Sequence, residues 1–169
     1  MFELLRNLKQ EIFKYCVYPV TLPYSILSNE YYKLIKNRKM EDLKNTTTQF
    51  VSINANYDKA FNYLTNPMLY KEWSTNFISD ILIEGGQHFA ITPMGKVRFI
   101  VKGDKQTGNI DLFFGDMPHP IPTRILKNGN GVTYLFTLFQ ADGMPDMAWE
   151  QGIKGLIEEL EILKTCLEK

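Results

Sequence analysis

Residues 121–139 have the sequence IPTRILKNGNGVTYLFTLF, which predicts two β-strands joined by a tight turn. The turn falls at residues 128–131, Asn-Gly-Asn-Gly, and these residue types tolerate the positive φ angles that a two-stranded hairpin requires. In the second strand apolar residues alternate with other residues, so that one face carries Val132, Tyr134, Phe136 and Leu138. The strands of a hairpin are antiparallel, because parallel neighbours need a long crossover connection. The stretch therefore predicts the start of an antiparallel sheet.

Segments with the alternation or the β-branched composition of strands precede this hairpin. They lie at residues 46–54, 78–84, 88–92, 97–102 and 109–114. Two short helices are expected after the first of them, one with Phe61 and Leu64 on its apolar side and a second that carries Leu69, Tyr70 and Trp73. Together with the hairpin, these segments predict a seven-stranded antiparallel sheet.

The last 24 residues have the periodicity of the longest helix in the chain. Its apolar stripe is formed by Trp149, Ile153, Leu156, Ile157, Leu160, Leu163 and Leu167. Four charged residues are expected to lie mostly away from that stripe: Glu158, Glu159, Glu161 and Lys164. A sheet with one apolar face needs a cover, and only this helix is long enough to supply it. We therefore expect an α+β fold in which the sheet curves around the C-terminal helix.

The N-terminal 45 residues differ from the rest of the chain. They predict two helices, at residues 3–18 and 28–42, separated by Pro19 and Pro23. Their net charge is +3, whereas residues 46–169 carry −3. We expect a helical extension over residues 1–45 and one domain over residues 46–169. A basic cluster and an amphipathic first helix would allow the extension to contact a membrane surface or another protein weakly.

Composition narrows the class of protein. The chain has 169 residues, of which 44% are hydrophobic and 22% charged, as in soluble proteins with a core. Its 19 basic and 19 acidic side chains cancel, so no global charge attracts nucleic acid. Cys16 and Cys166 are too few and too far apart for a disulfide scaffold. No uninterrupted apolar stretch has the length of a signal peptide core or a membrane span, and we expect a cytoplasmic protein.

Several motifs of the predicted domain resemble those of the START/SRPBCC superfamily, over about residues 46–169. These motifs are VSINA at residues 51–55, AFNYLTNP at 60–67, Trp73 after the second short helix, the hairpin 121–134 and LEILK at 160–164. The superfamily includes polyketide cyclases, START lipid carriers and coenzyme Q-binding proteins. The resemblance implies a helix-grip fold, in which the sheet grips the C-terminal helix and leaves an apolar cavity between them.

The leading hypothesis for function is the binding of a hydrophobic small molecule, lipid-like or aromatic, in that cavity. The candidate lining residues are Phe61, Trp73, Phe99, Phe113, Tyr134, Phe136, Trp149 and Ile153. Gly152 and Gly155 lie inside the last helix, where each costs about 1 kcal/mol relative to Ala, and either close packing or room for a ligand would explain them. A cavity below about 300 Å³ would favour a filled core, since ligand sites are usually larger.

An enzyme that resembles polyketide cyclases or dehydratases is the alternative. Asp111 lies among apolar residues, where burial would raise its pKa, and Arg124 on the neighbouring strand could pair with it. His119, in the stiff segment Pro118-His119-Pro120, completes the candidate set. A cross-strand ion pair on the outer face of the sheet is the other explanation of Asp111 and Arg124, and we expect it more than catalysis. A third interpretation is an interaction module that docks through residues 1–45.

Motifs for metal and nucleotide cofactors are not found in the sequence. The two histidines, His88 and His119, are far from either cysteine, and no H-E-x-x-H or paired C-x-x-C occurs. The glycines at 85–86 and 129–131 belong to turns rather than to a strand–loop–helix that would cradle phosphate. We expect no metal and no cofactor, and a binding protein more than an enzyme.

Overall fold

The structure is a computed structural model that describes residues 43–169, and residues 44–169 form one unit. The helices expected at residues 3–18 and 28–42 lie outside the described residues. In chain order the elements are β1 (Thr46–Ile53), α3 (Tyr57–Leu64), the 3-10 helix η1 (Pro67–Glu72), β2 (Asp80–Glu84), β3 (Gln87–Thr92), β4 (Gly95–Asp104), β5 (Asn109–Phe114), β6 (Ile121–Asn128), β7 (Gly131–Phe139) and α4 (Asp146–Leu167).

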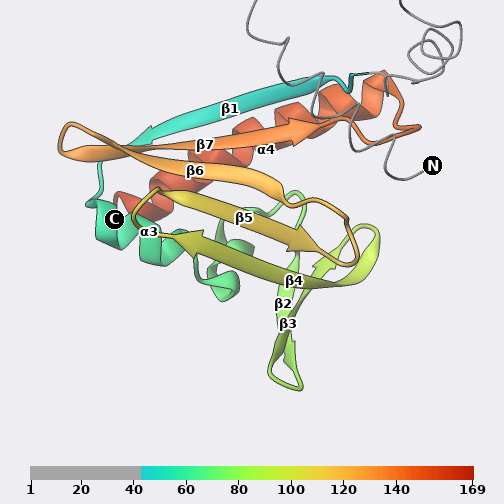
Figure 1. Cartoon of the computed structure of the whole chain (residues 1–169), viewed down its shortest axis with the longest axis horizontal. Helices are drawn as coiled ribbons and strands as arrows, with labels where there is room; N and C mark the ends of the chain where they lie inside the picture. Colours follow the sequence, from blue (N-terminus) through green and yellow to red (C-terminus); the bar gives the residue numbers. More distant parts are fainter. Residues whose placement is uncertain (1–42) are drawn as a thin grey trace, which may run out of the picture. The chain divides into compact units, whose positions relative to one another are not determined.

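The seven strands form one sheet in the order β1-β7-β6-β5-β4-β3-β2, and every neighbouring pair is antiparallel. The β6–β7 hairpin closes at Asn128 opposite Gly131, as its turn sequence predicts. The first strand joins the far side of this hairpin, with Val51 opposite Tyr134. Figure 1 shows the sheet twisting, so that β2 and β3 run nearly crosswise to β1 and β7. The expected seven-stranded antiparallel sheet with a long C-terminal helix is confirmed.

Alternation along the strands decides which side chains meet α4. On the neighbouring strands β5, β6 and β7 the buried residues are every second one: Ile110, Leu112 and Phe114 on β5, Thr123 and Ile125 on β6, and Val132, Tyr134 and Phe136 on β7. These residues share one core with Leu156, Leu160, Leu163 and Leu167 of α4. The helix therefore covers the apolar face of the sheet, as Figure 1 shows.

The stripe predicted on α4 is wrong at two positions. Ile157 is 45% exposed, whereas Glu159 is only 5% exposed. Glu159 follows Leu156 by three residues and precedes Leu163 by four, so the helical period places it on the buried face. The sequence interpretation assigned it to the solvent side because it is charged.

The two short helices close one end of the sheet. The side chain of Asn56 accepts a hydrogen bond from the backbone N–H of Asp58 and so caps α3. Phe61 of α3 packs over Gly103 of β4 so closely that a Cβ on this glycine would lie 2.8 Å from the Phe61 ring atom Cζ. Lys59 Nζ of α3 donates to the carbonyl of Leu167, 2.8 Å away, at the end of α4. This bond connects the C-terminus of α4 to α3. The expected second short helix is of the 3-10 type and ends before Trp73.

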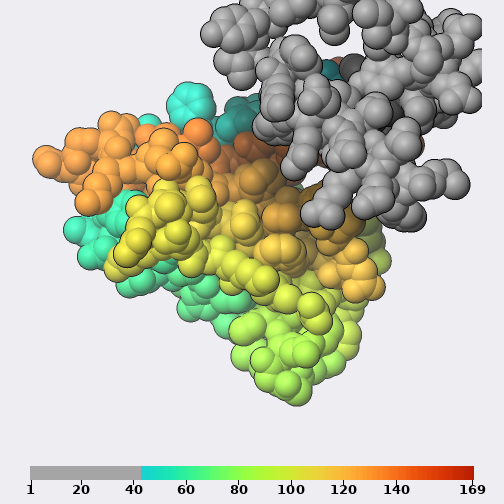
Figure 2. Space-filling model, in the orientation of Figure 1, coloured from blue at the N-terminus to red at the C-terminus, as the bar shows by residue number. Residues whose placement is uncertain are grey.

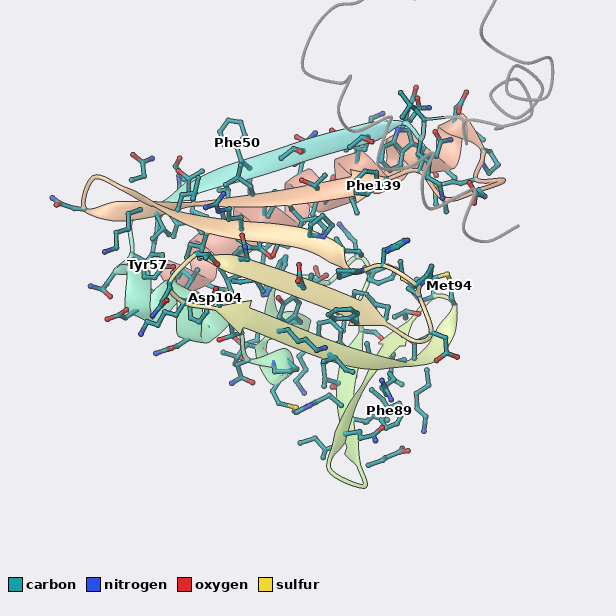
Figure 3. The ribbon with its side chains drawn as sticks, in the orientation of Figure 1. Phe50, Tyr57, Phe89, Met94, Asp104 and Phe139 are labelled. Carbon is teal, nitrogen blue, oxygen red and sulfur yellow. The ribbon has the colours of Figure 1, made fainter. Side chains whose placement is uncertain are left out.

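The opposite face of the sheet is partly apolar and open. Phe50 on β1 is 68% exposed, and Figure 3 shows its ring standing clear of the ribbon. The β2–β3 hairpin projects from the body of the described residues, as Figure 2 shows. None of the helices within residues 43–169 is long and apolar enough to cross a membrane.

Candidate functional site

A cavity of about 440 Å³ lies between the sheet and the first half of α4. Its sheet wall comes from β5, β6 and β7, and its opposite wall from α4 and from the segment that follows η1. The lining side chains on the sheet are Leu112, Phe114, Ile121, Phe136, Leu138 and Phe139. Those on α4 are Ala148, Trp149, Gln151, Gly152, Gly155, Leu156 and Glu159, and Tyr70, Trp73, Ser74, Asn76, Phe77, Met94 and Met144 complete the lining.

Aromatic rings in contact with one another form part of this wall and support it from behind. Phe77 meets Phe114 edge to face with ring centroids 5.3 Å apart, and Phe99 stacks behind Phe114 at 4.6 Å. Tyr134 lies edge-on to Trp73 at 6.4 Å and to Phe136 at 6.3 Å. Edge-to-face and stacked pairs of this kind stabilise the wall beyond the apolar area that they bury.

The two helix glycines differ in their surroundings. Gly152 is an exposed residue of the lining, and a Cβ on it would meet no atom of the described residues within 4 Å. A Cβ on Gly155 would lie 3.5 Å from the Asn76 side-chain nitrogen, an ordinary contact distance. Of the two explanations that the sequence left open, room for a guest fits Gly152, whereas close packing fits Gly155.

Glu159 is the charged side chain in the lining. Its Oε1 atom accepts hydrogen bonds from the backbone N–H groups of Asn76, at 2.7 Å, and Phe77, at 3.0 Å. Its Oε2 atom accepts from the Ser74 hydroxyl at 3.2 Å. The Asn76 side-chain nitrogen donates to the carbonyl of Gly155, 3.1 Å away, and to Glu158 Oε2 at 3.2 Å. These bonds join the segment after η1 to α4 along one edge of the cavity.

Burial raises the pKa of the Glu159 carboxyl above its ordinary value. The three hydrogen bonds from Asn76, Phe77 and Ser74 favour the charged form and oppose this shift, whereas the nearby Glu158 carboxylate adds to it. Desolvation is the largest of these effects, because the carboxyl lies at an apolar wall with no cation paired to it among the described residues.

Two buried polar atoms behind the cavity wall have no hydrogen-bond partner among the described residues. They are the indole nitrogen of Trp73 and the hydroxyl of Tyr134. The hydroxyl of Tyr70, by contrast, donates to the carbonyl of Leu64 at 2.8 Å. Burial raises the pKa of both tyrosines well above the ordinary value, so each stays a neutral phenol.

The structure places three of the eight predicted lining residues in the cavity wall: Trp73, Phe136 and Trp149. Two more, Phe99 and Tyr134, are buried directly behind the wall. Phe61 is a buried core residue of α3 that does not line the cavity. Ile153 is half-buried on α4 and does not line it either. Phe113 lies on the outer face of the sheet, where Lys102 Nζ sits 4.8 Å from its ring centroid.

The predicted catalytic candidates lie apart from the cavity. Asp111 shares the outer face of β5 with Phe113 and pairs across the sheet with Lys102 and Pro122. Arg124 is exposed on β6, and its Nε donates to the carbonyl of Thr107 at 3.2 Å. His119 is exposed in the connection between β5 and β6. Within residues 43–169 no ion pair includes Asp111 or Arg124.

Sequence reasoning missed several lining residues. Leu112 and Phe114 were available from the strand alternation, since they share a face with Ile110 and alternate with Asp111 and Phe113. Ser74, Asn76 and Phe77 follow η1 in a segment without regular periodicity, so no pattern marks them. The spacing of Glu159 to Leu156 and Leu163 indicates a position on the buried face of the helix. The sequence interpretation placed it on the solvent side because its side chain is charged.

Other hollows on the described surface have a different character. The groove of about 600 Å³ beside the β4–β5 turn is lined mostly by polar and charged residues, including Lys105, Arg124 and Lys127. Within the described part of the chain, no group of three or more His, Cys, Asp or Glu side chains is placed to hold a metal ion. The cavity under α4 is therefore the site whose lining fits a small apolar molecule.

Comparison with known proteins identifies the fold. No family model and no curated protein matches the sequence. An uncharacterised protein from Bacillus thuringiensis superposes with a TM-score of 0.58 at 11% identity, over 74% of this chain and 100% of that one. A protein from Bacillus halodurans gives a TM-score of 0.57 at 15% identity, over 73% of this chain and 97% of that one.

A START superfamily protein from Mycobacterium smegmatis also superposes, with a TM-score of 0.53 at 11% identity, over 73% of this chain and 97% of that one. Identities this low establish shared architecture and not shared activity. The chain therefore has the START-like helix-grip fold.

Proposed function

We propose that this protein binds a hydrophobic small molecule, lipid-like or aromatic, in the cavity between its sheet and α4. The observation that carries the proposal is the 440 Å³ volume of that cavity together with its mainly aromatic and aliphatic lining. This volume lies above the value of about 300 Å³ at which ligand sites of proteins usually begin.

Gly152 supports the same proposal. A glycine inside a helix costs about 1 kcal/mol relative to Ala, and this one faces open space rather than a closely packed neighbour. Apolar burial at about 25 cal/mol per Å² would supply the affinity. The polar edge formed by Ser74, Asn76 and Glu159 would orient the ligand.

Within the START/SRPBCC superfamily, the proposal places this protein with the members that bind ligands. It gives no role to Asp111, His119 or Arg124, since none of the three lines the cavity. The hypothesis that residues 1–45 dock to a membrane surface or a protein concerns a segment of which only residues 43–45 are described, and it stays a prediction.

The test uses N-phenyl-1-naphthylamine, a neutral apolar dye that accepts excitation energy from tryptophan. The chain has two tryptophans, and both line the cavity. Binding of the dye in the cavity should therefore quench tryptophan emission in a saturable way. Native mass spectrometry of the freshly purified chain would reveal a ligand already bound.

A variant that fills the cavity is compared with a matched control on the same helix. Gly152→Phe places a ring on the open side of α4 and should weaken dye binding at least about tenfold. Lys154→Phe adds the same ring at an exposed position of α4 that does not line the cavity, and it should bind like the wild type. An absence of saturable quenching in the wild type, or equal binding by Gly152→Phe, would overturn the proposal.

A further inference from the structure

We propose that the cavity selects an uncharged apolar ligand that carries a hydrogen-bond donor, such as a hydroxyl group, which it presents to Glu159. This inference rests on the proposed function and adds the chemical class of the ligand. It follows from the acceptor capacity of one side chain and from the charges that line the cavity.

Glu159 has a free acceptor position among the described residues. A carboxylate offers about four lone-pair positions to donors. Oε1 uses two of them for the backbone N–H groups of Asn76 and Phe77. Oε2 uses one for the Ser74 hydroxyl, and this bond is long at 3.2 Å. One position on Oε2 therefore has no donor, on a residue that is 5% exposed and lines the cavity.

A donor at that position would be stabilising because the carboxylate is poorly solvated. Among the described residues, the other donor-bearing side chains of the lining make no hydrogen bond to this carboxylate; they are Tyr70, Trp73, Asn76, Trp149 and Gln151. A hydroxyl group of a bound molecule would supply a donor at this position, and hydrogen bonds to charged acceptors are stronger than neutral ones. A carbonyl group of the same shape would bring two acceptors together and would lose this gain.

The charges at the cavity disfavour ligands that carry a carboxylate. None of the described residues that line the cavity is a Lys, Arg or His. Glu159 supplies a negative charge to the lining, and Glu158 supplies another one hydrogen bond away through the side chain of Asn76. A ligand carboxylate would therefore enter an apolar site with like charges nearby and no cation to pair with. The geometry disfavours free fatty acids and aromatic acids.

The orientation of the Glu159 bonds makes a substitution informative. Glu159→Gln can keep its carbonyl oxygen on the two backbone N–H groups of Asn76 and Phe77, and its amide nitrogen then occupies the place of Oε2. That nitrogen is a donor, so the variant offers the cavity a donor in place of an acceptor. A ligand preference that depends on Oε2 should therefore reverse, whereas a purely structural role of Glu159 would leave the preference unchanged.

The experiment measures displacement of N-phenyl-1-naphthylamine from the full chain at pH 8 by four matched naphthalenes. These are 2-ethylnaphthalene, 1-(2-naphthyl)ethanol, 2-acetylnaphthalene and 2-naphthoate. In the wild type we expect the alcohol to bind about tenfold more tightly than the ketone, and naphthoate to bind most weakly. In Glu159→Gln the ketone should bind at least as tightly as the alcohol. Glu158→Gln, which changes the adjacent carboxylate outside the lining, should keep the wild-type order.

The outcomes separate this inference from the proposed function. Equal affinity for alcohol and ketone in the wild type overturns the inference, as does tight binding of naphthoate, while binding of 2-ethylnaphthalene still upholds the function. An unchanged preference in Glu159→Gln also overturns it. If that variant fails to fold, the order of the four compounds in the wild type decides alone. If neither the dye nor any of the four compounds binds, the proposed function fails and the inference fails with it.

Discussion

The backbone nitrogen of Asn76 lies 2.7 Å from Oε1 of Glu159, so a carboxylate on α4 holds the segment that follows η1. The two residues are 83 positions apart in the chain. The bond fixes one edge of the cavity, because Asn76 and Glu159 both line it. It also explains why a charged residue is retained on the buried side of α4: the backbone N–H groups of Asn76 and Phe77 need an acceptor there.

Truncation of this acceptor should destabilise the protein. In Glu159→Ala the N–H groups of Asn76 and Phe77 lose their partner, and we expect a loss of about 1–3 kcal/mol in the free energy of unfolding. Glu159→Gln keeps an oxygen in place and removes a poorly solvated charge, so it should lose less than the alanine variant. Urea unfolding of both variants at neutral pH measures this difference. Equal losses in the two variants would show that the hydrogen bonds to Asn76 and Phe77 contribute little.

The raised pKa of Glu159 predicts how stability depends on pH. Because the folded protein holds this proton more tightly than the unfolded chain does, the contribution of Glu159 to stability falls as pH rises from its ordinary value of 4.5 through the raised value. Above that window the loss is complete and constant. The free energy of unfolding of the wild type, minus that of Glu159→Gln, should therefore decrease with pH and then level off.

Two exposed carboxyls act in the opposite direction and cancel in this comparison. A hydrogen bond from Lys71 lowers the pKa of Asp80, and the backbone N–H of Gln106 lowers that of Asp104. Their contributions are present above the unfolded pKa and are lost as pH falls, equally in both proteins. Urea titrations at steps between about pH 4 and pH 8 provide the data. A difference that increases with pH would contradict the raised pKa of Glu159.

Two buried tyrosines should respond oppositely to loss of the hydroxyl group. The hydroxyl of Tyr134 is buried without a hydrogen-bond partner among residues 43–169, so Tyr134→Phe removes an unsatisfied polar atom and should raise stability by up to about 1 kcal/mol. The hydroxyl of Tyr70 donates to Leu64, so Tyr70→Phe should lower stability by about 1 kcal/mol. Thermal or urea unfolding of the pair distinguishes them. A clear loss in Tyr134→Phe would mean that its hydroxyl has a partner in solution.

Replacement of two glycines by alanine should change the stability of the protein in opposite directions. Gly152→Ala adds a methyl group with no atom of the described residues within 4 Å and improves helix propensity, so stability should rise by about 1 kcal/mol. Gly103→Ala would drive its methyl group into Thr65 and Phe61, and should cost about 1–3 kcal/mol. Unfolding midpoints of the two variants in urea test both values. A destabilised Gly152→Ala would show that the space beside this residue is closed in solution.

Much of the fold could be predicted because it depends on local patterns. Turn residues at 128–131 and the alternation from Val132 to Leu138 predicted the β6–β7 hairpin within one residue of its observed bounds. Period and length likewise predicted α4. Details that depend on neighbours could not be obtained this way. Glu159 was assigned to solvent because its charge is a local property, whereas its partners Asn76 and Phe77 come from a distant segment.

The candidate site was less predictable than the fold. Aromatic residues were the natural choice for its lining, but Phe99 and Tyr134 support the wall from behind, and Phe113 lies on the other face of β5. The ring of a strand residue reaches the cavity only if its face, its position along the strand and the helix above it all agree. Strand alternation supplies the first condition, and tertiary packing supplies the other two.

The sequence by itself determined the seven strands, their antiparallel connection and the helix that covers them, because hydrogen-bonded hairpins and amphipathic periods are written in neighbouring residues. Only the tertiary structure decided that α4 leaves part of the apolar face of the sheet uncovered. The open space beside Gly152 and the buried Glu159 at its edge arise from the distance between α4 and the sheet, which no local pattern encodes. That distance is set by how side chains from β5, β7, α4 and the segment after η1 pack together. It leaves a cavity between the first half of α4 and the sheet.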